Sequence, residues 1–304
     1  MFNKFIATIL PYFPKKFVWI FSKRYVSGEK LEDAVNSSLD LYEKGSGSTI
    51  DLLGEFITDI SEAEVNKRVY LEIVERYSKE MNLNVTFSVK PTSFGLLIDE
   101  EACYQHIRDV VVKAKECNRL VTIDMEDSTC VDKEIRLYKR LHEEFPKNVG
   151  LVIQAYLKRS DADIEMLCKM QSPETPVDIR LCKGIYQEHE SIAFKGHDLI
   201  NQKFLENLET FFKNGVYVGI ATHDKFLVNG AYNLIEKYKL KPDQYEFQML
   251  YGVTPELRTS IIKKGHKMRV YVPFGTDWFG YCTRRLKENP KMAGMIIKAI
   301  FIRG

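Results

Sequence analysis

The 304-residue sequence lacks the cysteine pairs of a disulfide framework and the ligand spacing of a zinc site. Its six cysteines are scattered, and no two of them form a C-x-x-C pair. The six histidines are dispersed as well. Disulfide-rich domains and structural zinc sites need cysteines or histidines at close, regular spacings. We therefore expect reduced thiols, no metal site and a cytoplasmic chain.

An excess of one charge is also absent, as is a bias toward glycine or proline. Lys and Arg number 44 against 42 Asp and Glu, which gives a net charge of +2. This balance argues against a protein that binds nucleic acid through its bulk charge. The 17 glycines and 10 prolines are too few for a fibrous or low-complexity chain. The 45% hydrophobic residues instead indicate a globular protein.

Long hydrophobic runs are missing too, even in the aromatic N-terminal segment 1–27. The run Phe5–Leu10 stops at Pro11, and the run Phe17–Phe21 is flanked by lysines and Arg24. Neither approaches the roughly 20 residues of a membrane span. No small-residue cleavage site follows them, which argues against a secretory signal. Two interpretations stay open: a helix packed on the domain, or a segment lying peripherally on the inner face of an anionic membrane.

What the sequence does contain is a repeated strand-then-helix rhythm. Eight short runs of apolar and β-branched residues are predicted to be strands. They are Thr49–Leu53, Val85–Val89, Leu120–Asp124, Gly150–Gln154, Val177–Leu181, Val216–Ala221, Tyr245–Leu250 and Met268–Val272. Apolar residues three and four positions apart predict helices between them. These are Ala63–Met81, Glu100–Cys117, Lys133–Phe145, Asp161–Met170, His189–Lys213, Lys225–Tyr238 and Pro255–Lys264.

Eight strand–helix units within about 250 residues are typical of an α/β fold of the (β/α)8 TIM type. We expect this barrel to span residues 47–304, after an N-terminal helical segment, 1–46, that contains a first helix at Leu31–Lys44. A doubly wound sheet is the competing fold. It is disfavoured because no G-x-G-x-x-G follows a predicted strand and no G-x-x-x-x-G-K-[ST] occurs.

Polar residues gather where such a barrel would place chemistry. Active sites of (β/α)8 enzymes lie at the carboxyl ends of the strands. Reading only those ends gives Glu55, Lys90, Asp124 with Glu126, Gln154, Arg180 with Lys183, Thr222 with His223, Glu246 with Gln248, and Tyr271. One such residue alone would be a helix cap or a solvated loop residue. Polar or charged residues at the ends of all eight predicted strands predict a polar pocket in the barrel mouth.

Cations dominate this set once the Arg284–Arg285 pair, which follows the last strand, is included. Guanidinium groups bind carboxylates through paired hydrogen bonds. The pocket is therefore expected to take an anionic ligand, either a carboxylate or a phosphate. Two other interpretations stay open. One is a (β/α)8 aldolase or lyase that forms a Schiff base on Lys90 or Lys183, and the other is a non-catalytic carboxylate-binding barrel.

Longer motifs surround these residues between about 25 and 290. They are L-L-G-E (52–55), S-V-K (88–90), I-D-M-E-D (123–127), V-I-Q-A-Y-L-K-R (152–159), R-L-C-K-G-I-Y (180–186), A-T-H-D (221–224), Y-E-F-Q-M-L-Y-G (245–252), R-V-Y-V-P-F-G-T (269–276) and Y-C-T-R-R-L-K-E-N (281–289). In order and spacing they resemble the proline dehydrogenase family, in its monofunctional bacterial form. The sequence departs from the family pattern at Ile185, Asp224 and Tyr251.

The resemblance implies a distorted (β/α)8 barrel that holds FAD non-covalently and oxidises L-proline to Δ1-pyrroline-5-carboxylate. This is the first step of proline catabolism to glutamate. Electrons would pass to a membrane quinone. By motif match, the proline carboxylate would be held by Lys90, Arg284 and Arg285, and Tyr271 and Tyr281 would pack around the substrate.

The same match implies roles for the remaining residues. Asp124 would organise the site near Lys90, Arg180 would lie near the flavin N5 atom, and Glu55 would pair with Arg284 as a gate. Gln154 would bond the pyrimidine edge of the flavin. The other cofactor contacts implied are Met125, Lys183, Gly184 and Ile185 around the cofactor, and Thr222 and His223 at its adenosine or pyrophosphate end.

Overall fold

Eight parallel strands close into a barrel in the computed structural model of the chain, which describes Trp19 and residues 23–282. Each strand pairs with the next in sequence, and the last pairs with the first. The strands are β1 (Gly47–Leu52), β2 (Val85–Val89), β3 (Val121–Ile123), β4 (Val149–Gln154), β5 (Asp178–Cys182), β6 (Tyr217–Ala221), β7 (Tyr245–Leu250) and β8 (Met268–Phe274). The (β/α)8 prediction is confirmed.

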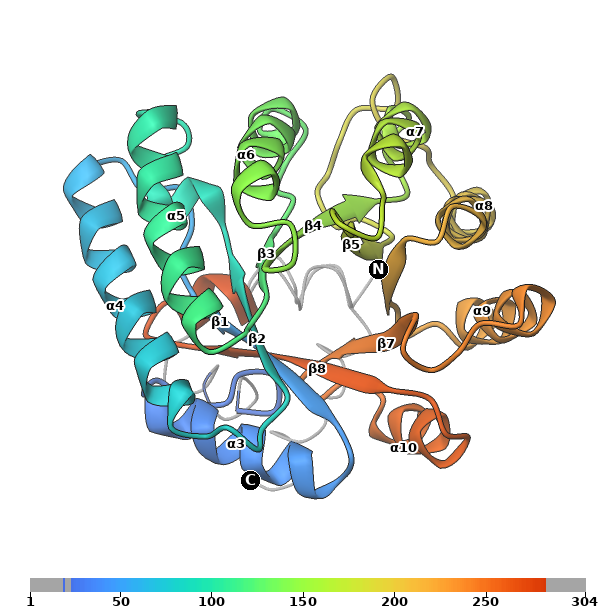
Figure 1. Ribbon diagram of the computed structural model, residues 1–304, viewed down its shortest axis with the longest axis horizontal. Coiled ribbons are helices and arrows are strands. Elements are labelled where there is room, and N and C mark those ends of the chain that lie inside the picture. The colour runs from blue at the N-terminus through green and yellow to red at the C-terminus, as the bar shows by residue number, and fades with distance from the viewer. Residues whose placement is uncertain (1–18, 20–22, 283–304) are drawn as a thin grey trace, which may run out of the picture.

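Helices surround this barrel (Figure 1). They are α3 (Leu31–Glu43), α4 (Ile60–Ser78), the short 3-10 helix η2 (Pro91–Phe94), α5 (Glu100–Glu116), α6 (Val131–Glu144), α7 (Ser160–Met170), α8 (His197–Lys213), α9 (Lys225–Tyr238) and α10 (Pro255–Lys263). None of the helices within the described part of the chain is long and apolar enough to cross a membrane. The domain boundary after residue 46 stays a prediction.

One predicted helix is wrong in its first third. The sequence predicts a helix from His189, but α8 begins at His197. The residues before it form a loop that makes an isolated antiparallel bridge between Leu157 and Ala193. Gly196 then adopts a φ of +90°, a conformation that glycine tolerates and that a continuous helix excludes. The loop before α8 is therefore tied to the segment that follows β4.

A second, smaller apolar cluster lies beside the end of β8. Leu53, Trp278 and Tyr281 form it with neighbouring buried residues, and the Trp19 ring packs 4.6 Å from that of Trp278. The chain before α3 is fixed here as well, because the Ser27 amide donates to the Pro273 carbonyl at 3.0 Å. Residues far apart in sequence thus meet at the rim of the barrel mouth.

The opposite end of the barrel also holds charged residues, which corrects one prediction. The strand ends predict Glu246 near the mouth, but it is the second residue of β7 and lies near the amino ends of the strands. Its carboxylate accepts from Arg269 Nε at 2.6 Å, and both residues are buried. A cavity of about 510 Å³ opens at this end and is lined by both residues and by Asp178.

Asp178 gives a pH-dependent stability at this end of the barrel. Burial, together with the negative charge of Glu246, raises the pKa of its carboxyl group to about 7 from 3.8. The folded chain therefore holds this proton more tightly than the unfolded chain does. The resulting stabilisation is complete below about pH 4 and is lost as the pH rises through about 7.

We expect Asp178→Asn to be more stable than the wild type at pH 8, because the amide has no charge to bury. The gain in unfolding free energy is expected to reach at most about 4 kcal/mol and to shrink toward pH 4. Urea unfolding at several pH values measures it. The exposed Asp243→Asn serves as the control. A gain that does not depend on pH would contradict the assigned cause.

Candidate active site at the barrel mouth

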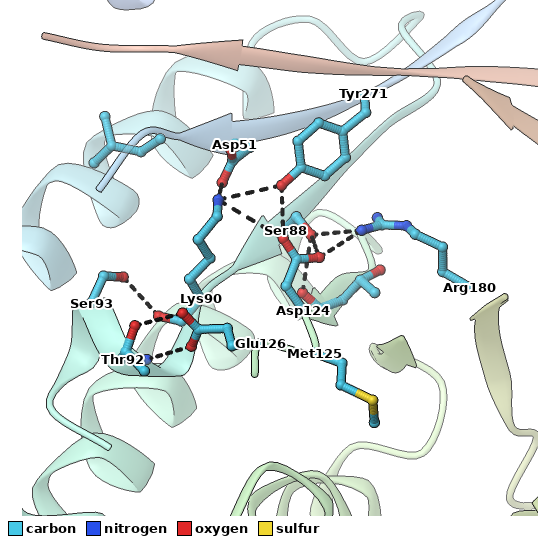
Figure 2. Close-up of polar contacts among 12 residues, drawn as sticks. Asp51, Ser88, Lys90, Thr92, Ser93, Asp124, Met125, Glu126, Arg180 and Tyr271 are labelled. Atoms are coloured by element: carbon cyan, nitrogen blue, oxygen red, sulfur yellow. Dashed lines mark hydrogen bonds and ion pairs between the residues drawn. The ribbon is translucent and has the colours of Figure 1, made fainter. Parts of the chain in front are cut away.

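Four residues predicted from the strand ends, Lys90, Asp124, Arg180 and Tyr271, converge at the carboxyl end of the barrel (Figure 2). Lys90 follows β2 directly, and Asp124 follows β3 directly. Arg180 lies within β5, and its side chain points into the barrel toward Asp124. Tyr271 comes from β8. The prediction that Tyr271 ends the last strand is wrong, since β8 continues beside β1 to Phe274.

Asp124 is the centre of the cluster. Its Oδ1 accepts from Arg180 Nη1 at 2.6 Å and from Ser88 Oγ at 2.6 Å. Its Oδ2 accepts from the Tyr271 hydroxyl at 2.7 Å. Burial and the adjacent Asp124 carboxylate raise the pKa of Tyr271 well above 10, so the hydroxyl stays protonated and keeps donating. Asp124 thus orients its neighbours by accepting hydrogen bonds on both oxygens.

Lys90 lies between two carboxylates, Asp51 and Asp124. Asp51 lies within β1 and is not among the residues predicted from the strand ends. Lys90 Nζ is 2.5 Å from Asp51 Oδ1 and 3.9 Å from Asp124 Oδ2. Burial opposes the charge on Lys90, but the charges of Asp51, Asp124 and Glu55 outweigh it and raise the pKa of the ammonium. This disfavours the Schiff-base alternative on Lys90, because a nucleophilic lysine needs a lowered pKa.

Asp51 is the buried counter-charge of Lys90. The residue is fully buried within β1, and this burial raises the pKa of its carboxyl to about 6 despite the adjacent Lys90. The Lys90 ammonium, 2.5 Å from Asp51 Oδ1, favours the ionised form of this carboxylate. Lys90 and Arg180 are therefore balanced by Asp51 and Asp124 before any substrate arrives.

Glu126 does not share the Asp124 cluster. Figure 2 shows its side chain directed toward Thr92. It accepts from Thr92 N at 2.9 Å and from Thr92 Oγ1 at 2.6 Å, and burial raises its pKa to about 7. Gln154 fixes the same loop by donating Nε2 to the carbonyls of Met125 at 3.3 Å and Glu126 at 2.8 Å. These contacts hold the segment after β3 in place beside the cluster.

A second polar group lies at the ends of β5 and β6, centred on Asp224. Its Oδ2 accepts from Lys183 Nζ at 2.8 Å and lies 3.1 Å from His197 Nε2. Burial opposes the charge on Asp224, but the hydrogen bond from Lys183 and the cap on α9 lower its pKa to about 2. The Asp224 amide donates in turn to Thr222 Oγ1 at 3.1 Å. This carboxylate therefore balances Lys183.

His223 and Gly184 shape the space around Asp224. His223 Nε2 accepts from the Leu250 amide at 2.8 Å, so in the neutral ring Nδ1 carries the proton. Gly184 has a φ of +109°, and a Cβ added there would lie 2.1 Å from the Tyr156 ring. Only glycine fits at this point. The chain from Lys183 to Ile185 therefore runs close over Tyr156 at the mouth.

The remaining predicted residues lie at the rim or beyond the described chain. Glu55 follows β1, Ile185 is 40% exposed, and Tyr281 is buried in the cluster with Trp278. Arg284 and Arg285 lie outside the described residues, so their place beside Lys90 stays a prediction. Among Trp19 and residues 23–282, no three His, Cys, Asp or Glu side chains are grouped as metal ligands would be.

Comparisons with known proteins agree with one another. The family model described as proline dehydrogenase matches residues 34–297. "Proline dehydrogenase 1" of Bacillus subtilis is 36% identical over 279 residues, which covers 92% of this chain and 90% of that protein. "Proline dehydrogenase" of Deinococcus radiodurans is 30% identical over 287 residues, covering 93% and 91%.

A solved structure agrees with the fold. Proline utilization A (PutA) of Bdellovibrio bacteriovorus, inactivated by N-propargylglycine, superposes with a TM-score of 0.85 at 24% identity. The match covers 91% of this chain and 33% of the PutA chain. At this identity the similarity supports the barrel architecture alone.

Proposed function

This chain belongs to the proline dehydrogenase family of oxidoreductases, and we propose that it oxidises L-proline to Δ1-pyrroline-5-carboxylate with bound FAD. The observation that carries the proposal is the buried cluster in which Arg180, Tyr271 and Lys90 surround Asp124. It lies at the barrel end where (β/α)8 enzymes act. The relatives named proline dehydrogenase support proline as the substrate.

The substrate carboxylate needs more positive charge than Lys90 and Arg180 offer. Asp51 and Asp124 already neutralise these two cations. A buried carboxylate without a counter-charge is strongly disfavoured. We therefore assign the additional charge to Arg284 and Arg285, which the family motif places at the substrate. Lys90 then contributes one ammonium hydrogen bond to the carboxylate, while Asp51 keeps that ammonium in place.

The residues near Asp224 suit FAD. The cofactor carries an anionic pyrophosphate, and Lys183 and His197, which both contact the Asp224 carboxylate, still expose 28% and 66% of their side chains. Gly184 brings the backbone close beside them. Lys183, Gly184, Ile185, Thr222 and His223 would hold the cofactor, with Gln154 and Met125 on its flavin side. When bound, FAD supplies the hydride acceptor.

The chain's own contribution is positioning. Oxidation removes a hydride and a proton across the C–N bond of the proline ring. The cationic side chains fix one end of the substrate, which aims its ring in a single direction. Both oxygens of Asp124 already accept hydrogen bonds, so its role is to hold Arg180 and Tyr271 rather than to remove the proton. We propose Glu55 as the gate over the bound substrate and Tyr281 as part of the wall.

We expect the purified protein, loaded with FAD, to bleach near 450 nm when L-proline is added without oxygen. The cause is electron transfer from substrate to flavin. Stopped-flow absorbance measures this, with D-proline as the control ligand. A water-soluble quinone added next should restore the band, as proposed for the natural acceptor, a membrane quinone. Protein that does not bind FAD, or that keeps its band with L-proline, would refute the proposal.

Peripheral membrane contact through residues 1–24 stays a prediction.

A further inference from the structure

One strand of the barrel contributes no side chain at the level of Arg180. The register places Gly219 of β6 opposite Arg180 of β5 and opposite Glu246 of β7. A Cβ added at Gly219 would lie 2.3 Å from Gln248 Nε2. The missing side chain leaves the space in which Gln248 of β7 reaches across β6 to Arg180.

Gln248 makes one hydrogen bond through its side-chain amide oxygen and one through its side-chain amide nitrogen. Its Oε1 accepts from Arg180 Nε at 2.8 Å. Its Nε2 donates to Glu246 Oε1 at 2.8 Å. An arginine can only donate and an ionised carboxylate can only accept. Glu246 thus sets the orientation of the amide and turns its oxygen toward Arg180.

Glu246 is itself fixed by Arg269. The guanidinium binds both carboxylate oxygens, through Nε at 2.6 Å and Nη2 at 3.1 Å. It also donates to the Ser48 carbonyl at 3.1 Å and to the Asn84 side chain at 3.0 Å. A continuous network, Arg180–Gln248–Glu246–Arg269, therefore connects the catalytic cluster with backbone at the other end of the barrel.

We propose that Gln248 and Glu246 are positioning residues for Arg180. Asp124 and Ser88 hold one end of the guanidinium through Nη1, and Gln248 holds it from the Nε side. With both sides fixed, the group cannot rotate away from the reacting atoms. Groups that orient a functional side chain in this way are worth large factors in activity although they never touch substrate. The inference rests on the proposed role of Arg180.

Gln248→Met tests the contact directly, because it keeps the side-chain length and removes the acceptor. We expect kcat for L-proline to fall roughly ten- to a hundred-fold, as for the loss of a hydrogen bond to a charged group, with a smaller change in KM. The matched control is Thr86→Val, which removes a buried hydroxyl that is hydrogen-bonded to Thr49 at 2.9 Å. It should lower the melting temperature and leave kcat unchanged.

Gln248→Glu adds a readout that a purely structural role would not move. The introduced carboxyl group reproduces both bonds of the amide when it is protonated, whereas its ionised form repels Glu246 and competes with Asp124 for Arg180. We expect near-normal kcat at low pH and an additional loss of activity as the pH rises. A pH profile with the wild-type shape would overturn the inference.

Arg180→Leu separates this inference from the proposed function. If Arg180→Leu is inactive while Gln248→Met keeps wild-type kcat, the positioning role is refuted and the proposed function is unaffected. If Gln248→Met and Thr86→Val lose equal activity, the network is merely structural and the inference fails. If Arg180→Leu remains active, the role proposed for Arg180 fails, and the inference that depends on it fails as well.

Discussion

Arg180→Leu is expected to lower kcat/KM for L-proline by roughly 30-fold or more, because truncating one partner of a buried charge pair costs about 2–5 kcal/mol. Arg180 is 7% exposed and binds Asp124 at 2.6 Å. Its loss leaves the Asp124 carboxylate with only neutral donors and Lys90 beside it. The Tyr271 ring also loses the guanidinium carbon that lies 5.1 Å from its centre. Steady-state kinetics with L-proline and a soluble electron acceptor measure the effect.

A surface arginine provides the control for this substitution. Arg136 pairs with Glu100 on exposed helices, and 58% of its side chain is accessible. Exposed pairs contribute about 0–1 kcal/mol to stability. Arg136→Leu is therefore expected to leave both kcat/KM and folding nearly unchanged. If Arg180→Leu kept kcat/KM within threefold of the wild type, the buried pair would have no role in catalysis.

Arg180→Lys distinguishes charge from geometry at the same position. A lysine keeps the positive charge but cannot reach Gln248 and Asp124 with two separate fixed donors. Activity between that of the wild type and that of Arg180→Leu is expected. Equal activity of the lysine variant and the wild type would mean that charge alone is required.

The sequence was sufficient for the barrel and for most of the residues that meet at its mouth. Lys90 and Asp124 could be predicted because each follows a buried strand directly, and such positions face the mouth in any (β/α)8 barrel. Asp51 was missed because it lies inside a predicted strand, before its end. The available signal was a single carboxylate in an apolar run, since a buried charge needs a partner.

Cross-barrel pairing could not be predicted in the same way. Whether Glu246 faces the inside of the barrel, where it meets Arg269, depends on the register of β7, because one residue of slip turns a side chain to the opposite face. The contact of Gln248 with Arg180 further requires the glycine at 219 in the strand between them. Such partners follow from the three-dimensional register, which spacing along the chain does not encode.

The other large effect is expected at the Lys90–Asp51 pair. A double-mutant cycle separates the contribution of Lys90 to stability from its contribution to activity. Lys90→Met leaves Asp51 fully buried without its counter-charge, so unfolding free energy at pH 8 should fall by about 3–5 kcal/mol. Adding Asp51→Asn removes the isolated charge, and most of that stability should return. Activity should not return, because no ammonium is left to meet the substrate carboxylate.

The control cycle uses a pair of the same residue types on the surface. Lys203 and Asp161 lie 3.1 Å apart, and 55% of the Asp161 side chain is exposed. The coupling of this surface pair should be below about 1 kcal/mol, whereas the coupling of Lys90 with Asp51 should be at least about 2 kcal/mol. Denaturant unfolding of the four proteins in each cycle gives the couplings, and proline kinetics of the same proteins give the activities. If the double variant regained activity together with stability, Lys90 would serve only to neutralise Asp51. The proline carboxylate would then have to be held by other cations.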